Sequence, residues 1–204
     1  MDEPHIIPLF SKVFYIKNLN IDSKKIVSLI DKDFGKIDSD FGNAASSTDS
    51  KQVLEKKKFK FSKKQVMEEF NFFTKEVLKY ENKFKMSTSW FTKTNKNQQS
   101  NYHCHSNCMM SGILYIQVDE NSGDINFTDY SMTRFLLNPK EPNLYNSRSW
   151  RFKPENGMVI FFPSEVYHKI LESHSSIERY SLAFNFIPIG DIYAKQSDSY
   201  LYLK

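Results

Sequence analysis

The chain has 204 residues and is 40% hydrophobic, which is enough to bury a full core, so we expect one domain over 1–204. Its 28 basic and 24 acidic side chains leave a formal charge of +4, too small to draw the whole molecule to nucleic acid or to a membrane. The two cysteines are too few for a disulfide framework, and the densest apolar run, 158–162, is too short to cross a bilayer, so we expect a soluble cytoplasmic protein.

Residues 1–83 are predicted to form an opening strand and supporting helices. The stretch 6–16 is rich in the β-branched and aromatic side chains typical of strands, and Asp22 is a candidate cap for a short helix after it. Small polar residues over 36–52 indicate a surface loop.

A second helix is predicted to begin at a capping box formed by Ser62 and Gln65. Its apolar side chains recur every three or four positions, as expected of a helix lying on an apolar surface. They are Val66, Phe70, Phe73, Val77 and Tyr80. The basic run 56–64 is interpreted as the solvated flank of this helix rather than as a nucleic-acid site.

From residue 84 the apolar period changes to two, which is typical of strands, and we assign 84–190 to a β-barrel core. Strands are predicted at 112–118, 124–127, 150–152, 158–162 and 179–186. On the last strand one face carries Arg179, Ser181, Ala183 and Asn185, and the other face is apolar. The polar face suits a wet cavity inside a barrel. The fold expected is mainly β with N-terminal helices, a jelly roll.

Two histidines lie two positions apart in the sequence NYHCHSN. On extended backbone, His103 and His105 point the same way, so both imidazoles can reach one metal ion. His168, which follows Pro163 after a buried strand, is a candidate third ligand at the rim of the barrel. A single histidine is more often structural than a ligand, but two adjacent ligands and a distant one are typical of a facial metal site with open positions.

Arg179 and Ser181 lie eleven and thirteen positions after His168 and share one strand face. A guanidinium and a hydroxyl together suit a carboxylate, because the planar guanidinium donates two parallel hydrogen bonds. An arginine that points into a barrel requires an anion. That anion is either a ligand or an internal Asp or Glu, and the pattern leaves both open.

The order of these motifs resembles the 2-oxoglutarate/Fe(II)-dependent oxygenases, which are similar to prolyl hydroxylases, and in particular a bacterial and marine-phage branch of them. The resemblance covers about 84–188 and suggests a viral source as one possibility. Its motifs are His103-x-His105-x-Asn107, Pro154-x-x-Gly157, Phe161-Phe162-Pro163-Ser164, His168 and Glu178-Arg179-x-Ser181-x-Ala183-Phe184-Asn185.

The resemblance implies a double-stranded β-helix that binds Fe(II) and uses 2-oxoglutarate and molecular oxygen. The implied reaction hydroxylates a peptidyl residue or a small metabolite and releases succinate and CO2. It also implies that Arg179, Ser181 and Tyr115 bind the distal carboxylate of 2-oxoglutarate.

The chain departs from the usual His-x-Asp/Glu metal motif, because no carboxylate lies two positions after either histidine. In one arrangement His103, His105 and His168 are the three ligands. In the other, Tyr102 marks His105 as the first ligand and Asn107 replaces the acid. The first is favoured because neutral imidazole is a better ligand for Fe(II) than a carboxamide oxygen.

Three alternatives to the oxygenase are weighed. Cys104 and Cys108 with the two histidines make a zinc site conceivable, but all four lie within six residues, whereas structural zinc sites draw ligand pairs from separate segments. A cupin-like enzyme that does not use 2-oxoglutarate, or a non-catalytic jelly-roll binding module, would also fit the barrel. Substrate specificity is expected to reside in loops 36–60 and 128–149, and the oligomeric state is left open.

Overall fold

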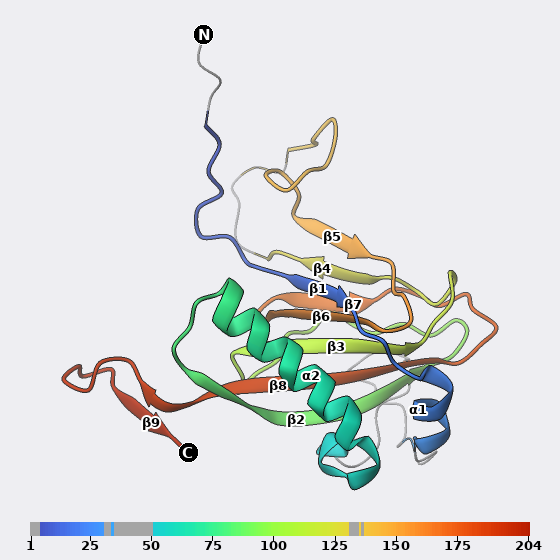
Figure 1. Ribbon diagram of the computed structural model, residues 1–204. Coiled ribbons are helices and arrows are strands. Elements are labelled where there is room, and N and C mark those ends of the chain that lie inside the picture. The colour runs from blue at the N-terminus through green and yellow to red at the C-terminus, as the bar shows by residue number, and fades with distance from the viewer. Residues whose placement is uncertain (1–4, 31–33, 35–50, 131–134, 136) are drawn as a thin grey trace.

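The computed structural model describes residues 5–30, 34, 51–130, 135 and 137–204 (Figure 1). Two antiparallel sheets face each other, and the N-terminal helices cover the outer side of the larger one. The predicted architecture, mainly β with N-terminal helices, is confirmed.

The larger sheet has the strand order β1-β6-β3-β8-β2, with β9 paired to the far end of β8. These strands are β1 (Tyr15–Asn18), β6 (Met158–Pro163), β3 (Met110–Gln117), β8 (Arg179–Ile192), β2 (Lys83–Thr94) and β9 (Leu201–Leu203). The smaller sheet has the order β5-β4-β7, formed by β5 (Ser149–Phe152), β4 (Ile125–Thr128) and β7 (Tyr167–Ile170). Each predicted strand of the core is present, whereas β2, β7 and β9 were not predicted as individual strands.

The helices lie where the N-terminal half was expected to provide them. They are α1 (Ser23–Leu29), the 3-10 turns η2 (Val53–Glu55) and η3 (Lys57–Phe59), α2 (Lys60–Phe72) and the π-helical turn η4 (Phe73–Val77). Asp22 caps α1 as predicted, because its side chain accepts a hydrogen bond from the Lys25 amide at 3.0 Å.

The capping box at Ser62 and Gln65 was a wrong prediction. The helix α2 begins at Lys60, directly after η3, and Ser62 is buried within its first turn. The buried ring of Phe59 anchors this entry into the helix. Tertiary packing therefore decides the start of α2, where no side-chain cap is present.

The predicted strand over 6–16 is also largely wrong. Only 15–18 pair with another strand, β6, and residues 5–13 before it are exposed, with Phe10 fully so. Apolar residues there have no neighbouring strand to pair with, and a strand requires a hydrogen-bonded partner. The predicted loop 36–52 lies mostly outside the described residues.

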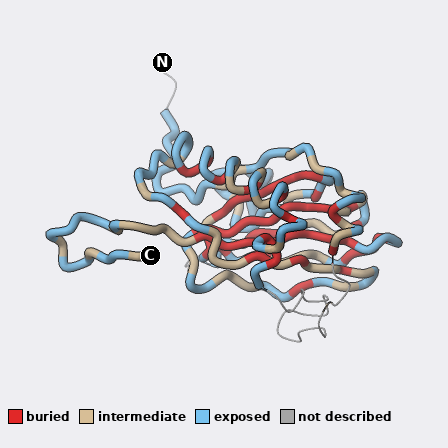
Figure 2. Tube along the Cα trace, turned by 60° about the horizontal axis from the view of Figure 1, so that its bottom comes forward, coloured by how far each residue is buried: buried red, intermediate tan, exposed pale blue. Residues whose placement is uncertain are grey.

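The core forms two layers, which Figure 2 shows as buried stretches along the central strands. The first layer lies between α2 and the apolar face of the larger sheet, where Phe70 and Phe186 stack with ring centroids 3.6 Å apart. The second lies between the two sheets and includes Phe127 and Phe162.

Across the described ranges, no helix is both long and apolar enough to pass through a bilayer.

The two faces of β8 divide as predicted. Leu182, Phe184 and Phe186 point into the layer beneath the helices. The opposite face, with Arg179, Ser181 and Asn185, points toward the smaller sheet. The strand that supports the helices on one side therefore carries polar groups into the barrel on the other.

Candidate functional site

The structure brings His103, His105 and His168 together. One nitrogen of each ring can be chosen so that all three lie within 4.8 Å of one another, the spacing of a metal site. The ring centroids of His103 and His168 are 4.4 Å apart, and those of His105 and His168 are 5.0 Å apart. Of the His, Cys, Asp and Glu side chains that the structure describes, only these histidines form such a group.

Backbone hydrogen bonds hold the histidine segment against the barrel. His103 and His168 form an isolated antiparallel bridge, with their N–H···O distances at 3.0 and 2.8 Å. The His105 amide donates to the Ser164 carbonyl at 2.9 Å. Residues 101–105 are thus not a regular strand, yet the predicted alternation holds, because His103 and His105 converge.

The expectation that His168 sits at a rim after Pro163 needs correction. The turn after β6 reverses the chain, and His168 lies within β7 with only 6% of its surface exposed. Its ring packs against Phe127 and Phe162, at centroid distances of 5.6 and 4.9 Å. A strand thereby holds this histidine on the inner face of the smaller sheet.

Each histidine ring is held by a hydrogen bond at Nδ1. Nδ1 of His103 lies 2.9 Å from the Asn101 carbonyl, and Nδ1 of His168 lies 3.0 Å from the Val166 carbonyl. Nδ1 of His105 lies 2.7 Å from Oδ1 of Asn185. Carbonyl oxygens only accept, so Nδ1 donates in each ring and the lone pair remains on Nε2. In all three rings Nε2 is therefore the atom that could bind a metal.

The environment keeps these rings neutral. Burial lowers the pKa of His105 to about 4, although its bond to Asn185 opposes this shift. Burial also lowers the pKa of His103, and it lowers the pKa of His168 well below its ordinary value with the help of the two neighbouring histidines. Neutral imidazole is the form that binds a metal.

A cluster of buried polar side chains lies at the other end of the same face of β8. Arg179 and Tyr115 are both 0% exposed, and the guanidinium carbon lies 5.1 Å from the centre of the Tyr115 ring. Strand register brings Tyr115 opposite Ser181. Arg179 Nη1 donates to the Ser181 hydroxyl at 3.2 Å, and Thr92 lies 2.6 Å from that hydroxyl.

Several polar atoms of this cluster lack partners. Within the described part of the chain, Nε and Nη2 of Arg179 and the hydroxyl of Tyr115 make no hydrogen bond, and no carboxylate forms an ion pair with Arg179. Burial lowers the pKa of Arg179 and raises the pKa of Tyr115 to about 12, the latter against the pull of the Arg179 charge. A buried unpaired cation is costly, so the cluster fits an anionic ligand.

Strand β2 contributes a wall of the site that was missed from the sequence. Thr88, Trp90, Thr92 and Thr94 stand opposite Asn185, Ala183, Ser181 and Arg179 in the β2–β8 register. The Trp90 ring lies 5.6 Å from that of His105. The sequence does show threonine and tryptophan alternating over 88–94. Only the pairing of β2 with β8 shows that these residues stand beside Arg179, Ser181 and Asn185.

Two other sequence candidates lie elsewhere. Asn107 is exposed and has left-handed backbone, with φ of 60°, in the turn after His105. Cys104 and Cys108 are free, half-buried thiols outside the histidine group.

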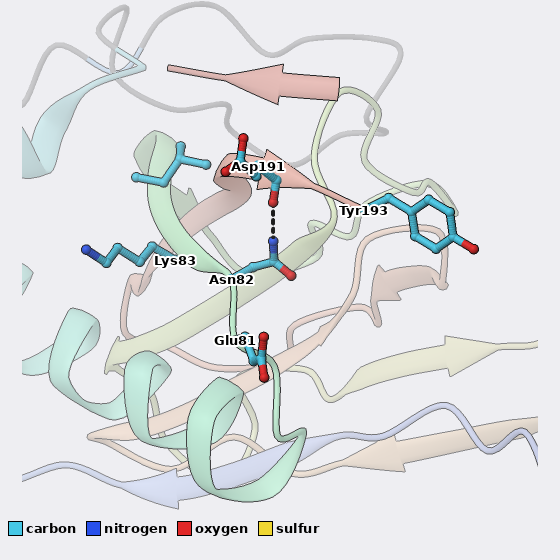
Figure 3. Close-up of a pocket in the computed structure, with 6 residues that line it drawn as sticks. Glu81, Asn82, Lys83, Asp191 and Tyr193 are labelled. Atoms are coloured by element: carbon cyan, nitrogen blue, oxygen red, sulfur yellow. Dashed lines mark hydrogen bonds between the residues drawn. The ribbon is translucent and has the colours of Figure 1, made fainter. Parts of the chain in front are cut away.

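A pocket lies where β8 leaves the larger sheet, and Figure 3 shows its lining. Asn82 donates there to the Asp191 carbonyl at 3.0 Å. The lining residues are Glu81, Asn82, Lys83, Ile189, Asp191 and Tyr193, which include neither histidine nor arginine. This pocket is therefore not the predicted site.

Comparison with known proteins agrees with the geometry. A family model described as "Putative 2OG-Fe(II) oxygenase" matches residues 88–185, the stretch that contains the three histidines and Arg179. Residues 88–185 are therefore similar to the 2OG-Fe(II) oxygenase family. No curated protein matches the chain in sequence.

Solved structures show the same fold at low identity. A viral collagen prolyl hydroxylase from Paramecium Bursaria Chlorella virus-1, in complex with 2OG, is 12% identical, with a TM-score of 0.54, 85% of this chain and 94% of that one covered. HygX from Streptomyces hygroscopicus, with nickel, 2-oxoglutarate and hygromycin B bound, is 11% identical, with a TM-score of 0.56. The match covers 86% of this chain and 82% of the HygX chain. A prolyl hydroxylase from Trichoplax adhaerens, in complex with a peptide fragment, is 11% identical, with a TM-score of 0.59. The match covers 85% of this chain and 83% of the hydroxylase chain.

These findings confirm the double-stranded β-helix and the enzyme class. The family that residues 88–185 match uses Fe(II), 2-oxoglutarate and molecular oxygen together with a substrate, and the three histidines could hold the metal. The cupin-like enzyme without 2-oxoglutarate and the non-catalytic binding module are disfavoured by the family match.

Proposed function

We propose that His103, His105 and His168 bind the Fe(II) of this oxygenase through Nε2. The support is that all three Nδ1 atoms are hydrogen-bonded to acceptors and that burial keeps the rings neutral. Bound Fe(II) would supply, together with 2-oxoglutarate and oxygen, the oxidation of an unactivated C–H bond with release of succinate and CO2. His103 takes the place of the carboxylate that is usual in such sites, since Asn107 lies exposed beyond it.

The proposal assigns the distal carboxylate of 2-oxoglutarate to Arg179, Ser181 and Tyr115. The single observation that carries it is the fully buried guanidinium without a carboxylate partner in the described residues. A dicarboxylate would accept hydrogen bonds from the orphaned donors of Arg179 and Tyr115 and would neutralise the buried charge.

The substrate proposed is an organic molecule with an unactivated C–H bond, either a peptidyl residue or a small metabolite. Of the structural neighbours, one holds a peptide and one holds hygromycin B. The Trp90 side chain, next to His105, would contact a substrate at the metal. Loops 36–60 and 128–149 are proposed to select it, and both lie partly outside the described residues.

An anaerobic titration tests this function. Metal-free protein is mixed with Fe(II), with 2-oxoglutarate, and with both, and the visible absorbance is followed. We expect a weak charge-transfer band that requires both components. A band with Fe(II) alone, or the absence of any band while the protein stays folded, would contradict the assignment of the two pockets.

A further inference from the structure

His105 is held differently from the other two histidines. The rings of His103 and His168 are bonded to backbone carbonyls two positions earlier, so their support is local. The support of His105 comes from side chains: its Nδ1 lies 2.7 Å from Oδ1 of Asn185, which is 80 positions away in the sequence, and 2.9 Å from Oγ of Ser111. The orientation of this one ring therefore depends on a side chain and can be changed by substitution.

The Asn185 amide is itself held on both sides. Its Oδ1 accepts from Ser111 Oγ at 2.8 Å as well as from His105 Nδ1, and its Nδ2 donates to Thr88 Oγ1 at 2.9 Å. Ser111 also lies 2.8 Å from the Ser164 hydroxyl. Asn185 is 8% exposed, so water does not readily replace these partners.

Strand register places this network. Ser111 on β3 and Thr88 on β2 both stand opposite Asn185 on β8, so the three form one row across the larger sheet. An irregularity in β2 between Met86 and Thr88 makes Ser87 an extra residue, so that Thr88 stands opposite Asn185 and its hydroxyl accepts from the side-chain amide, while the Ser87 hydroxyl donates to the Asn185 backbone carbonyl at 3.3 Å.

We propose that Asn185 is a positioning residue that fixes His105 in the tautomer with Nε2 free for the metal, through a hydrogen-bonded row that reaches Thr88 and Ser111. This inference rests on the proposed function, in which His105 is a metal ligand. If the amide were turned over, its NH2 group would face His105, Nδ1 would have to accept, and Nε2 would carry the hydrogen. The orientation of one amide thus decides whether His105 can bind a metal.

Thr88 contributes to that orientation because it gives the amide NH2 group an acceptor. With an isosteric valine there, the NH2 group loses this partner and is better satisfied by turning toward His105 and Ser111, both of which can accept. Thr88→Val should therefore act on His105 in the same direction as loss of Asn185, although it touches neither the ring nor the metal.

The experiment measures two quantities on the full chain. The first is the dissociation constant of Co(II), from its visible absorption. The second is the His105 tautomer in metal-free protein, from long-range ¹H–¹⁵N NMR spectra. For Asn185→Leu we expect 10- to 100-fold weaker Co(II) binding, the range typical for loss of a partner behind a metal ligand, and a smaller Nδ1–H population, because only the Ser111 hydroxyl then remains beside Nδ1. Asn185→Asp keeps the acceptor and should retain both. Thr88→Val should weaken Co(II) binding less than Asn185→Leu and shift the tautomer the same way.

The outcomes distinguish the positioning role of Asn185 from the proposed role of His105 as a ligand. Unchanged Co(II) binding in Asn185→Leu, or weaker binding with the tautomer preserved, would overturn the positioning role. If Asn185→Leu fails to fold, Thr88→Val decides, and an unchanged tautomer there would overturn it equally. His105→Ala is the check on the proposed function, because unchanged Co(II) binding in that variant would remove His105 from the ligands whatever Asn185 does.

Discussion

At the scale of single residues, the surroundings of Arg179 give the strongest support for the proposed 2-oxoglutarate site. Its guanidinium is fully buried, yet only one of its nitrogens has a protein hydrogen-bond partner in the described residues. Sequence reasoning had left an internal ion pair open as its role. None of the described carboxylates forms such a pair with Arg179, so the charge of its guanidinium has no counter-ion among the described residues.

Replacing Arg179 by lysine tests that site. Lysine keeps the charge but loses the planar two-pronged donor, and a charge-assisted hydrogen bond is worth roughly 1.5–3 kcal/mol. We expect the 2-oxoglutarate concentration for half-saturation to rise by about one to two orders of magnitude, measured by succinate formation or by the anaerobic band. Co(II) affinity without 2-oxoglutarate should stay the same. The exposed Arg151→Lys is the matched control; equal effects of both variants would contradict the prediction.

The choice between His103 and Asn107 can be decided by comparing their alanine variants. His103→Ala should weaken Co(II) binding by at least about a hundredfold, beyond the range typical for an outer partner, because a ligand is lost. Asn107→Ala should leave it near wild type, because Asn107 is exposed in the turn. His168→Ala should behave as His103→Ala does while far-UV circular dichroism stays native. The reverse order of the first two variants would favour the carboxamide arrangement.

At the scale of elements, β8 joins the two halves of the molecule. One face packs Phe184 and Phe186 beneath α2, and the other carries Arg179, Ser181 and Asn185 into the barrel. Packing of the helix therefore holds the strand on which both proposed binding functions depend.

Truncating the centre of that packing should destabilise the whole fold. Phe70 is 0% exposed and stacks on Phe186, so Phe70→Ala removes a large buried ring and leaves a cavity. We expect a loss of about 3–5 kcal/mol in the free energy of unfolding, measured in urea. Phe61→Ala, on the same helix but 69% exposed, should stay within about 0.5 kcal/mol of wild type. A small effect of Phe70→Ala would mean that α2 is not a structural support of β8.

At the scale of the whole molecule, the site opposes the stability of the metal-free protein. His168 and Arg179 are buried and His103 and His105 are half-buried, so grouping these side chains carries a cost in stability that binding of metal and 2-oxoglutarate would relieve. We also propose that 1–204 form a single domain, since the first core layer combines residues of α1 and α2 with those of β3, β6 and β8. One cooperative transition in urea is expected.

The pH dependence of stability follows from the histidines. Their pKa values are lowered in the folded protein, to about 4 for His105, so below the ordinary histidine pKa of about 6.5 the unfolded chain binds protons that the folded chain does not. Above pH 6.5 these histidines do not lower the stability of the folded protein. The free energy of unfolding decreases as the pH falls from 6.5 toward 4. For each histidine, the free energy of unfolding should fall by up to about 1.4 kcal/mol per pH unit in this range. Urea unfolding of metal-free protein at pH 7.5 and 5.5 measures this, and His105→Gln should reduce the difference. Equal stability of the wild type at both values would contradict the prediction.

The sequence by itself determined the elements and the chemical groups. Alternation of apolar residues predicted the strands and the two faces of β8, because side-chain direction in a strand follows from the local backbone. The spacing of His103 and His105, the distant His168 and the pair Arg179 and Ser181 predicted a metal site and an anion pocket. These motifs in order also indicated the family, which the comparisons confirmed.

Only the tertiary structure decided which groups meet and how they are held. The convergence of the three rings depends on a bridge between residues 103 and 168, and the Nδ1 partner of His105 comes from a strand 80 positions away. The same holds for the start of α2, the place of His168 in β7, and the wall that β2 gives the cavity. Local patterns determine the direction of a side chain along its own strand. Register between strands and the satisfaction of buried polar groups depend on partners far away in the chain, so they are decided only when the sheets assemble.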